Sequence, residues 1–175
     1  ESEIIPRISE YSNTQNKVSA ADFISNRNYQ IQIEQSSKKC LVQDTSRNRA
    51  QTLWFYERVR GQYTNQPNIG ASNSEKKAFQ RRNPKDQKLD KSQLAKYYNT
   101  FECLPHEVSK GAQKNLMKFA DNIEKKLGDK EDISFINELF YKETIGKTIL
   151  YRRIEKEFLR ADWYEGYRAQ IVNYS

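Results

Sequence analysis

Lysine and arginine side chains gather in the middle of this 175-residue chain, where their charge suits the binding of phosphate groups. Residues 41–126 carry seventeen basic and nine acidic side chains, while the segments on either side are close to neutral. This excess accounts for the formal net charge of +7. Clustered cations beside aromatic side chains are typical of a nucleic-acid surface, because cations pair with phosphates and rings stack on bases. The alternative is a solvated basic face that keeps the protein in solution.

Three groups of side chains are candidates for nucleic-acid contacts. The first is an amide-rich loop, whose Asn and Gln side chains either hydrogen-bond to bases and phosphates or hold the loop's own backbone. The second consists of two arginines near the rings of Trp54 and Tyr56, together with a basic segment further along the chain. For the two rings, packing in the core is the favoured alternative. The third is a Lys-Gly turn at a predicted helix start, where a purely structural turn is the favoured alternative. The candidates are Asn13, Gln15, Asn16, Lys17, Arg58, Arg60, Lys76, Lys77, Arg81, Arg82, Lys110 and Lys114.

The residue types that catalysis needs show no recognised arrangement. His106 is the only histidine, which excludes sites built on two imidazoles, and with Cys40 and Cys103 it falls one ligand short of structural zinc. Neither glycine-rich nucleotide-binding fingerprint occurs. The acidic side chains considered for a metal-dependent nuclease have no nuclease-like spacing; they are Glu10, Asp22, Glu57 and Asp90. We therefore expect no metal and no cofactor, assign no catalytic residue, and leave open whether the protein is an enzyme.

Helices are the main elements expected to position these residues. Capping residues and apolar periodicity predict helices over 20–24, 29–41, 75–82, 91–98, 105–111, 112–127 and 134–159. The predicted caps include Ser74 and the capping box of Asp90 and Gln93, and a strand is the alternative at the start of 29–41, where polar and apolar residues alternate. Aromatic and β-branched content predicts a strand over 53–63, with a helix as the alternative, and residues 3–11 predict an edge strand. The expected fold class is α+β, mostly helical, with a small sheet formed by N-terminal and middle segments.

Finer expectations follow for two of these elements. The helix over 134–159 is expected to begin after Asp132 and to bury an apolar stripe that consists of Ile136, Leu139, Phe140, Ile145, Ile149, Leu150, Ile154 and Phe158. Glu57 and Arg58 are expected to form an ion pair that orients the strand over 53–63.

The chain is expected to form one domain over 1–175, with a mixed strand and helix part over 1–63 and a helical part over 74–175. Its first residue is Glu, its first predicted strand begins at residue 3, and residues 167–175 predict a helix without a stop signal. We therefore expect a fragment of a longer protein.

Two cysteines make no disulfide scaffold, and no run approaches 18 apolar residues. We therefore expect a cytoplasmic protein with no membrane contact.

Several short motifs resemble the AIPR family, named for abortive infection phage resistance. Three of them occur in the family's order, at residues 13–18 (NTQNKV), 22–26 (DFISN) and 56–61 (YERVRG). Residues 91–97 and 104–115 add to the resemblance, whereas the family's preceding N-G-x-Q-T element is absent. The resemblance implies a bacterial cytoplasmic protein of anti-phage defence, from a family often found with restriction-modification genes.

These observations together predict a bacterial defence protein fragment that contributes nucleic-acid binding through a basic face. Two alternatives stay open. The chain is part of a defence nuclease that acts with a missing N-terminal region, or it is an interaction module that docks other defence-system proteins. An exposed apolar patch of Trp54, Phe55 and Trp163 would favour the interaction module.

Overall fold

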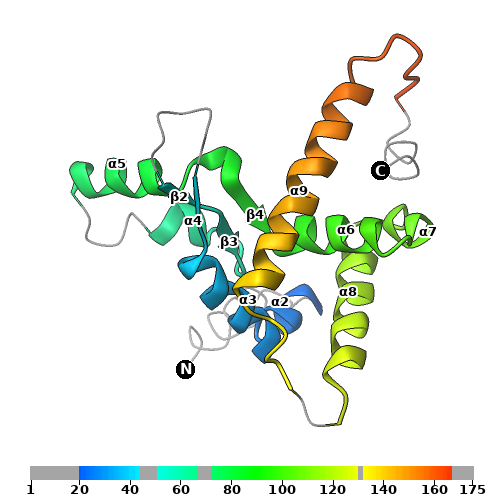
Figure 1. The fold of residues 1–175 in the computed structure, drawn as a ribbon, viewed down its shortest axis with the longest axis horizontal. Coiled ribbons are helices and arrows are strands. Elements are labelled where there is room, and N and C mark those ends of the chain that lie inside the picture. The colour runs from blue at the N-terminus through cyan, green and yellow to red at the C-terminus, as the bar shows by residue number, and fades with distance from the viewer. Residues whose placement is uncertain (1–19, 44–50, 67–71, 130–131, 167–175) are drawn as a thin grey trace, which may run out of the picture.

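A computed structural model describes residues 20–43, 51–66, 72–129 and 132–166, and helices dominate these segments (Figure 1). The helices are α2 (Ala20–Ser25), α3 (Asn28–Lys39), α4 (Gln62–Asn65), α5 (Asn73–Arg82), the 3-10 turn η2 (Lys85–Gln87), α6 (Lys91–Phe101), α7 (Pro105–Val108), α8 (Ala112–Leu127) and α9 (Glu138–Phe158). The strands are β1 (Leu41–Gln43), β2 (Gln51–Leu53), β3 (Phe55–Glu57) and β4 (Lys88–Asp90). The predicted fold class, α+β and mostly helical, is confirmed.

Short strands form two small two-stranded sheets. In one, β1 pairs antiparallel with β2, and Leu41 lies opposite Leu53. In the other, β3 pairs parallel with β4, and Tyr56 lies opposite Leu89. The continuous strand predicted over 53–63 is therefore wrong: it breaks at Trp54 between β2 and β3, and it ends before α4. The predicted strand over 3–11 lies outside the described residues.

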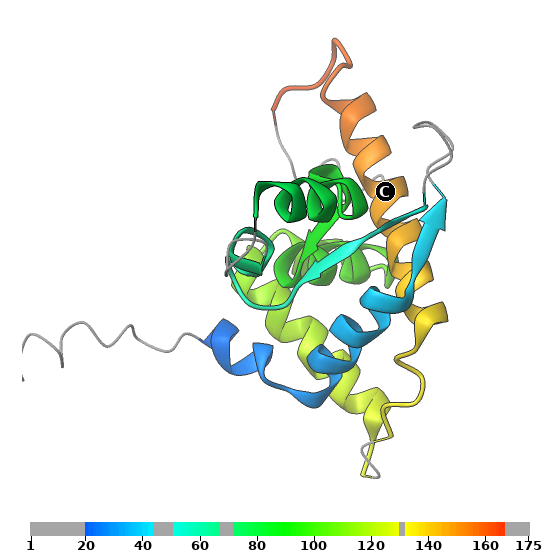
Figure 2. The same ribbon diagram turned by 90° about the vertical axis from the view of Figure 1, so that its left-hand side faces the viewer.

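The core lies where α6 crosses α8 and α9, with α3 packed against α9 and β3. Its largest buried side chains are aromatic or branched aliphatic, and they include Tyr29, Tyr56, Tyr141, Tyr151, Phe119, Leu89, Leu94 and Ile123. The C-terminal half of α9 extends beyond this core in both views (Figure 1, Figure 2). Within the described part of the chain, no helix combines the length and the apolar character needed to cross a membrane.

The buried face of α9 differs from the predicted stripe. It consists of Tyr141, Thr144, Ile145, Thr148 and Tyr151, whereas Leu139, Ile149 and Leu150 are exposed. Threonine can occupy this face because its hydroxyl bonds to the carbonyl one turn earlier: Thr144 Oγ1 donates to Phe140 O at 2.9 Å, and Thr148 Oγ1 donates to Thr144 O at 2.8 Å. The helix also starts later than predicted, because Asn137 and not Asp132 is its N-cap.

Side-chain caps begin two of the other helices, α5 and α6. Asp90 accepts hydrogen bonds from the backbone N–H groups of Ser92 and Gln93, and the Gln93 side chain completes the predicted capping box of α6. Helix α8 has the predicted bounds. Ser72, and not the predicted Ser74, is the N-cap of α5, so this helix begins two residues earlier than predicted.

Candidate nucleic-acid interface

Helix α5 lies at the edge of the molecule, on the side opposite α7, and faces the viewer in Figure 2. None of its residues is buried, so apolar burial does little to form it. A capping box stabilises its first turn instead: Ser72 N donates to Glu75 Oε2 at 2.7 Å, and Ser72 Oγ accepts from Glu75 N at 3.4 Å. The Glu75 carboxylate accepts from Ser72 N and also from Ser72 Oγ, at 2.9 Å, and these two bonds lower the pKa of Glu75. The helix therefore owes its position to a cap and to one aromatic anchor.

That anchor is Phe79, which holds α5 against the strand and helix beneath it. Its ring lies 5.8 Å from the ring of Phe55 in an edge-to-face arrangement and 5.5 Å from the ring of Tyr63. The Tyr63 hydroxyl donates to Asn83 O at 2.6 Å, just past the end of α5. This cluster fixes the helix while its other faces remain in solvent.

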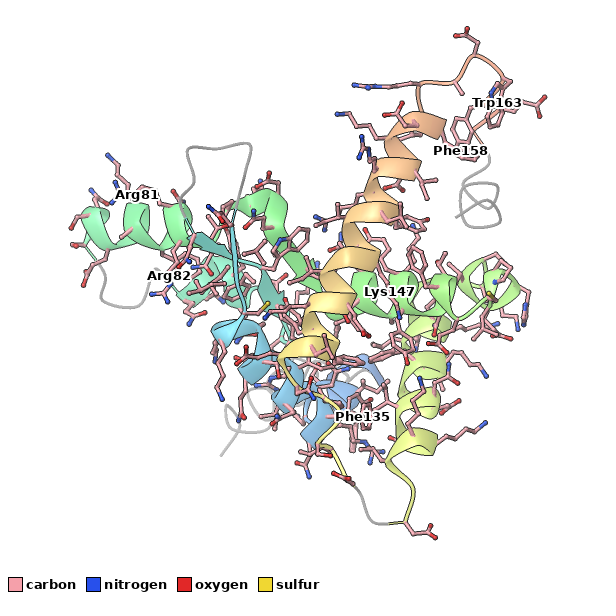
Figure 3. The ribbon with its side chains drawn as sticks, viewed as in Figure 1. Arg81, Arg82, Phe135, Lys147, Phe158 and Trp163 are labelled. Carbon is pink, nitrogen blue, oxygen red and sulfur yellow. The ribbon has the colours of Figure 1, made fainter. Side chains whose placement is uncertain are left out.

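Four of the ten residues of α5 are basic, and Lys85 follows in η2. Lys77 and Arg81 are one helical turn apart, an arrangement in which like charges repel. Among the described residues, none of these five cations forms an ion pair. We define the α5 face as Lys76, Lys77, Arg81, Arg82 and Lys85; Arg81 and Arg82 are labelled in Figure 3.

A cavity of about 300 Å³ opens between this face and the strands. Its lining consists of Tyr63, Thr64, Lys76, Phe79, Gln80, Lys85 and Lys88. Lys76, Phe79 and Gln80 reach it together because positions three and four apart share one side of a helix. The lining thus includes three lysines and two aromatic residues. Tyr63 and Phe79 were not among the predicted contacts, and the Lys-x-x-Phe spacing in α5 is the signal that could have found Phe79.

The far wall of this cavity is held by the core. The Lys88 ammonium donates to Glu57 Oε2, and Glu57 Oε1 accepts from Tyr63 N at 3.2 Å. Arg152 of α9 donates to Asp86 O at 2.6 Å and to Lys88 O at 2.9 Å, while its guanidinium lies 5.4 Å from the Trp54 ring. A site built on such supports is positioned before any ligand arrives.

The Arg58 side chain forms hydrogen bonds within the protein. Its Nε donates to Glu34 Oε2 at 2.6 Å, and its Nη1 donates to Ser25 O at 2.8 Å. The predicted pair between Glu57 and Arg58 is wrong, because Glu57 pairs with Lys88 and Arg58 pairs with Glu34. Burial raises the pKa of Glu34, but hydrogen bonds from Arg58, Lys38 and Gln62 outweigh burial and hold that pKa below its ordinary value.

The remaining predicted contacts lie elsewhere. Arg60 is exposed in the turn before α4. Lys110 and Lys114 are exposed near α7 and the start of α8, on the side of the molecule opposite α5 (Figure 1). Lys110 binds Glu107 at 2.7 Å, and the turn at Gly111 is held by Asn115 Nδ2, which donates to Val108 O at 2.7 Å. Asn13, Gln15, Asn16 and Lys17 lie outside the described residues.

A family model described as AIPR protein matches residues 1–175, the whole chain. The chain belongs to the AIPR family. No curated protein and no solved structure matches it. Membership in the AIPR family supports a role in abortive infection and phage resistance.

Two of the acidic side chains considered for a nuclease have structural partners in this AIPR chain: Asp90 caps α6 and Glu57 binds Lys88. Glu10 and the side chain of Asp22 lie outside the described part of the structure. Cys103 is exposed just before α7, and His106 is exposed within α7, with its Nε2 3.6 Å from Glu107 Oε1. In the part of the chain that the structure describes, no three His, Cys, Asp or Glu side chains are grouped as a metal site requires.

The aromatic patch expected of a docking module does not form. Trp54 and Phe55 are buried, at 5% and 9% exposure, which also confirms that Trp54 belongs to the core. Trp163 is 61% exposed, and its ring lies 5.2 Å from that of Phe158 beyond the end of α9 (Figure 3). The three side chains therefore cannot form one surface.

Proposed function

We propose that this AIPR chain binds nucleic acid through the α5 face, and that this binding is its contribution to phage resistance. One observation carries the proposal: five cations lie together on an exposed helix and its following turn, with no carboxylate paired to them among the described residues. Unopposed like charges cost stability in the free protein. Phosphates would relieve that repulsion and release condensed counterions.

The structural alternative for part of this charge is stabilisation of α5 itself. Arg81 and Arg82 lie in its last turn, where a cation favours the helix dipole by about 0.3–1 kcal/mol. That reason does not extend to Lys76 and Lys77, which are the fourth and fifth of the ten residues of α5 and lie outside its last turn. Lys85 lies outside the helix altogether. Ligand binding accounts for all five cations, and helix stabilisation accounts for two.

Fluorescence anisotropy with single-stranded DNA, single-stranded RNA and duplex DNA tests the proposal. If each of the five cations meets one phosphate of a single strand, the logarithm of affinity falls by about 3.5 per tenfold rise in salt. Affinity then drops roughly a hundredfold between about 50 and 200 mM salt. The double variant Arg81→Glu/Arg82→Glu should bind far more weakly and should lower that slope by at least about 1.4.

The matched control reverses two arginines far from α5. Arg153 is exposed on α9, and Arg160 follows that helix and pairs only with the exposed Glu157 among the described residues. Arg153→Glu/Arg160→Glu changes net charge equally and should leave most of the binding in place. Equal losses in the two double variants would show a diffuse charge effect and would refute the α5 face. Circular dichroism confirms that both variants are folded.

A further inference from the structure

We infer that the cavity beside α5 receives one unpaired nucleotide, so that the protein prefers single-stranded nucleic acid to duplex. The inference rests on the proposed function and names the substrate class for the same surface. It depends on the combination of residues that line the cavity, which are aromatic on one side (Tyr63 and Phe79) and basic on the other (Lys76 and Lys85).

The two walls match the two halves of a nucleotide. Tyr63 and Phe79 provide apolar aromatic surface, and base–aromatic contact is the usual way in which proteins hold unpaired bases. Lys76 and Lys85 provide charge for a phosphate, and neither forms an ion pair within the described segments. Gln80 adds an amide that can both donate to and accept from a base edge.

The third lysine of the cavity, Lys88, has a structural role. Lys88 is bound to Glu57, so its charge is largely compensated before any ligand arrives. The same carboxylate accepts from Tyr63 N, which ties the aromatic wall to this ion pair. Lys88 and Glu57 therefore position the ring, while Lys76 and Lys85 supply the attraction for phosphate.

Size and shape favour one unpaired nucleotide. The cavity's volume of about 300 Å³ lies at the lower end of the range for small-ligand pockets. A duplex keeps its bases paired and stacked inside, and it must flip a nucleotide out before a base can enter such a pocket. A single strand presents bases without that cost. Duplex binding would then use only the phosphate contacts of the α5 face.

The test compares one oligonucleotide sequence as a single strand and within a duplex, against the full chain and the variant Phe79→Leu. Leucine keeps apolar contact with Phe55 and removes the aromatic surface. We expect at least a tenfold preference for the single strand, and a roughly tenfold loss of single-strand affinity in Phe79→Leu. Duplex affinity should change less than about twofold.

Two further variants make the result specific. Phe135→Leu alters a part-buried ring on a different side of the molecule and should leave both affinities unchanged (Figure 3). Lys76→Gln leaves the aromatic packing intact, so it tests the cavity even if Phe79→Leu unfolds. It should weaken single-strand binding several-fold and lower the salt slope by about 0.7.

The outcomes separate the inference from the function on which it rests. Equal single-strand and duplex affinities, or equal losses of both in Phe79→Leu, would overturn the nucleotide cavity while α5-dependent binding survives. Binding that is absent, or that is untouched by Arg81→Glu/Arg82→Glu, would overturn the proposed function itself. A single-strand preference lost only in Phe79→Leu and Lys76→Gln supports both.

Discussion

Replacement of Arg58 by glutamine separates a structural arginine from a nucleic-acid contact. The guanidinium joins β3 to α3 through Glu34 and reaches the end of α2 through the carbonyl of Ser25. The side chains of Arg58 and Glu34 are 20% and 10% exposed. Both groups lie in a partly desolvated environment, where the loss of a charged hydrogen bond is felt in stability.

The expected loss follows from these contacts. Removal of one partner of a buried ion pair costs about 3–5 kcal/mol. The loss should be smaller here, because Glu34 keeps Lys38 at 2.9 Å and Gln62 at 2.8 Å, and water reaches part of the site. We therefore expect Arg58→Gln to lower the free energy of unfolding by about 2–3 kcal/mol. For a chain of this length that corresponds to a fall in Tm of about 5–10 °C.

Urea and thermal unfolding measure this loss, and Arg60→Gln is the control. Arg60 is exposed two residues away, so its replacement should change stability by no more than about 0.5 kcal/mol. At a temperature where Arg58→Gln is folded, its affinity for a single strand should stay within about twofold of the original value. A variant that melts like the original chain but no longer binds nucleic acid would refute the structural role of Arg58.

Three further predictions concern stability. Gly111 has φ of 98°, so Gly111→Ala should cost about 1–3 kcal/mol in urea unfolding. Gly146→Ala, at an exposed position of α9, should be neutral or stabilising, and equal effects of the two substitutions would contradict the backbone argument. Asp90→Ala removes the cap of α6 and should cost about 0.5–2 kcal/mol by the same assay, and an unchanged midpoint would show that the cap is dispensable. The pKa of Glu34 is lowered in the folded protein, so its ionisation stabilises the fold above the ordinary glutamate value of about 4.3. The stability gap to Glu34→Gln should therefore shrink as pH falls below that value, and a gap that widened in acid would contradict the sign.

Local signals in the sequence predicted the helices well, because caps act over three or four residues. The box of Asp90 and Gln93 and the amphipathic pattern over 112–127 both appear as expected. The strand over 53–63 was predicted from aromatic and β-branched content, and part of it is strand: β2 ends at Leu53 and β3 spans Phe55–Glu57. Its length was wrong because such content favours a strand without showing where the strand breaks or ends.

Long-range partners account for the rest of what the sequence did not predict. The sequence suggested that Arg58 is a surface cation, because its partner Glu34 lies 24 residues earlier and on a different element. The cavity beside α5 needs β4 and η2 to meet the face of α5, an arrangement fixed by Arg152 from α9. The basic character of α5 itself was predictable, since its cations lie within seven consecutive residues.

Mapping of the contact surface by NMR tests the central claim most directly. Backbone amide signals of the labelled chain are followed while a short single-stranded oligonucleotide is added. We expect the largest shifts in α5, η2 and the residues around Tyr63, and we expect Arg81→Glu/Arg82→Glu to abolish them. Shifts that gather instead near Lys110 and Lys114, or beyond the end of α9, would contradict the central claim.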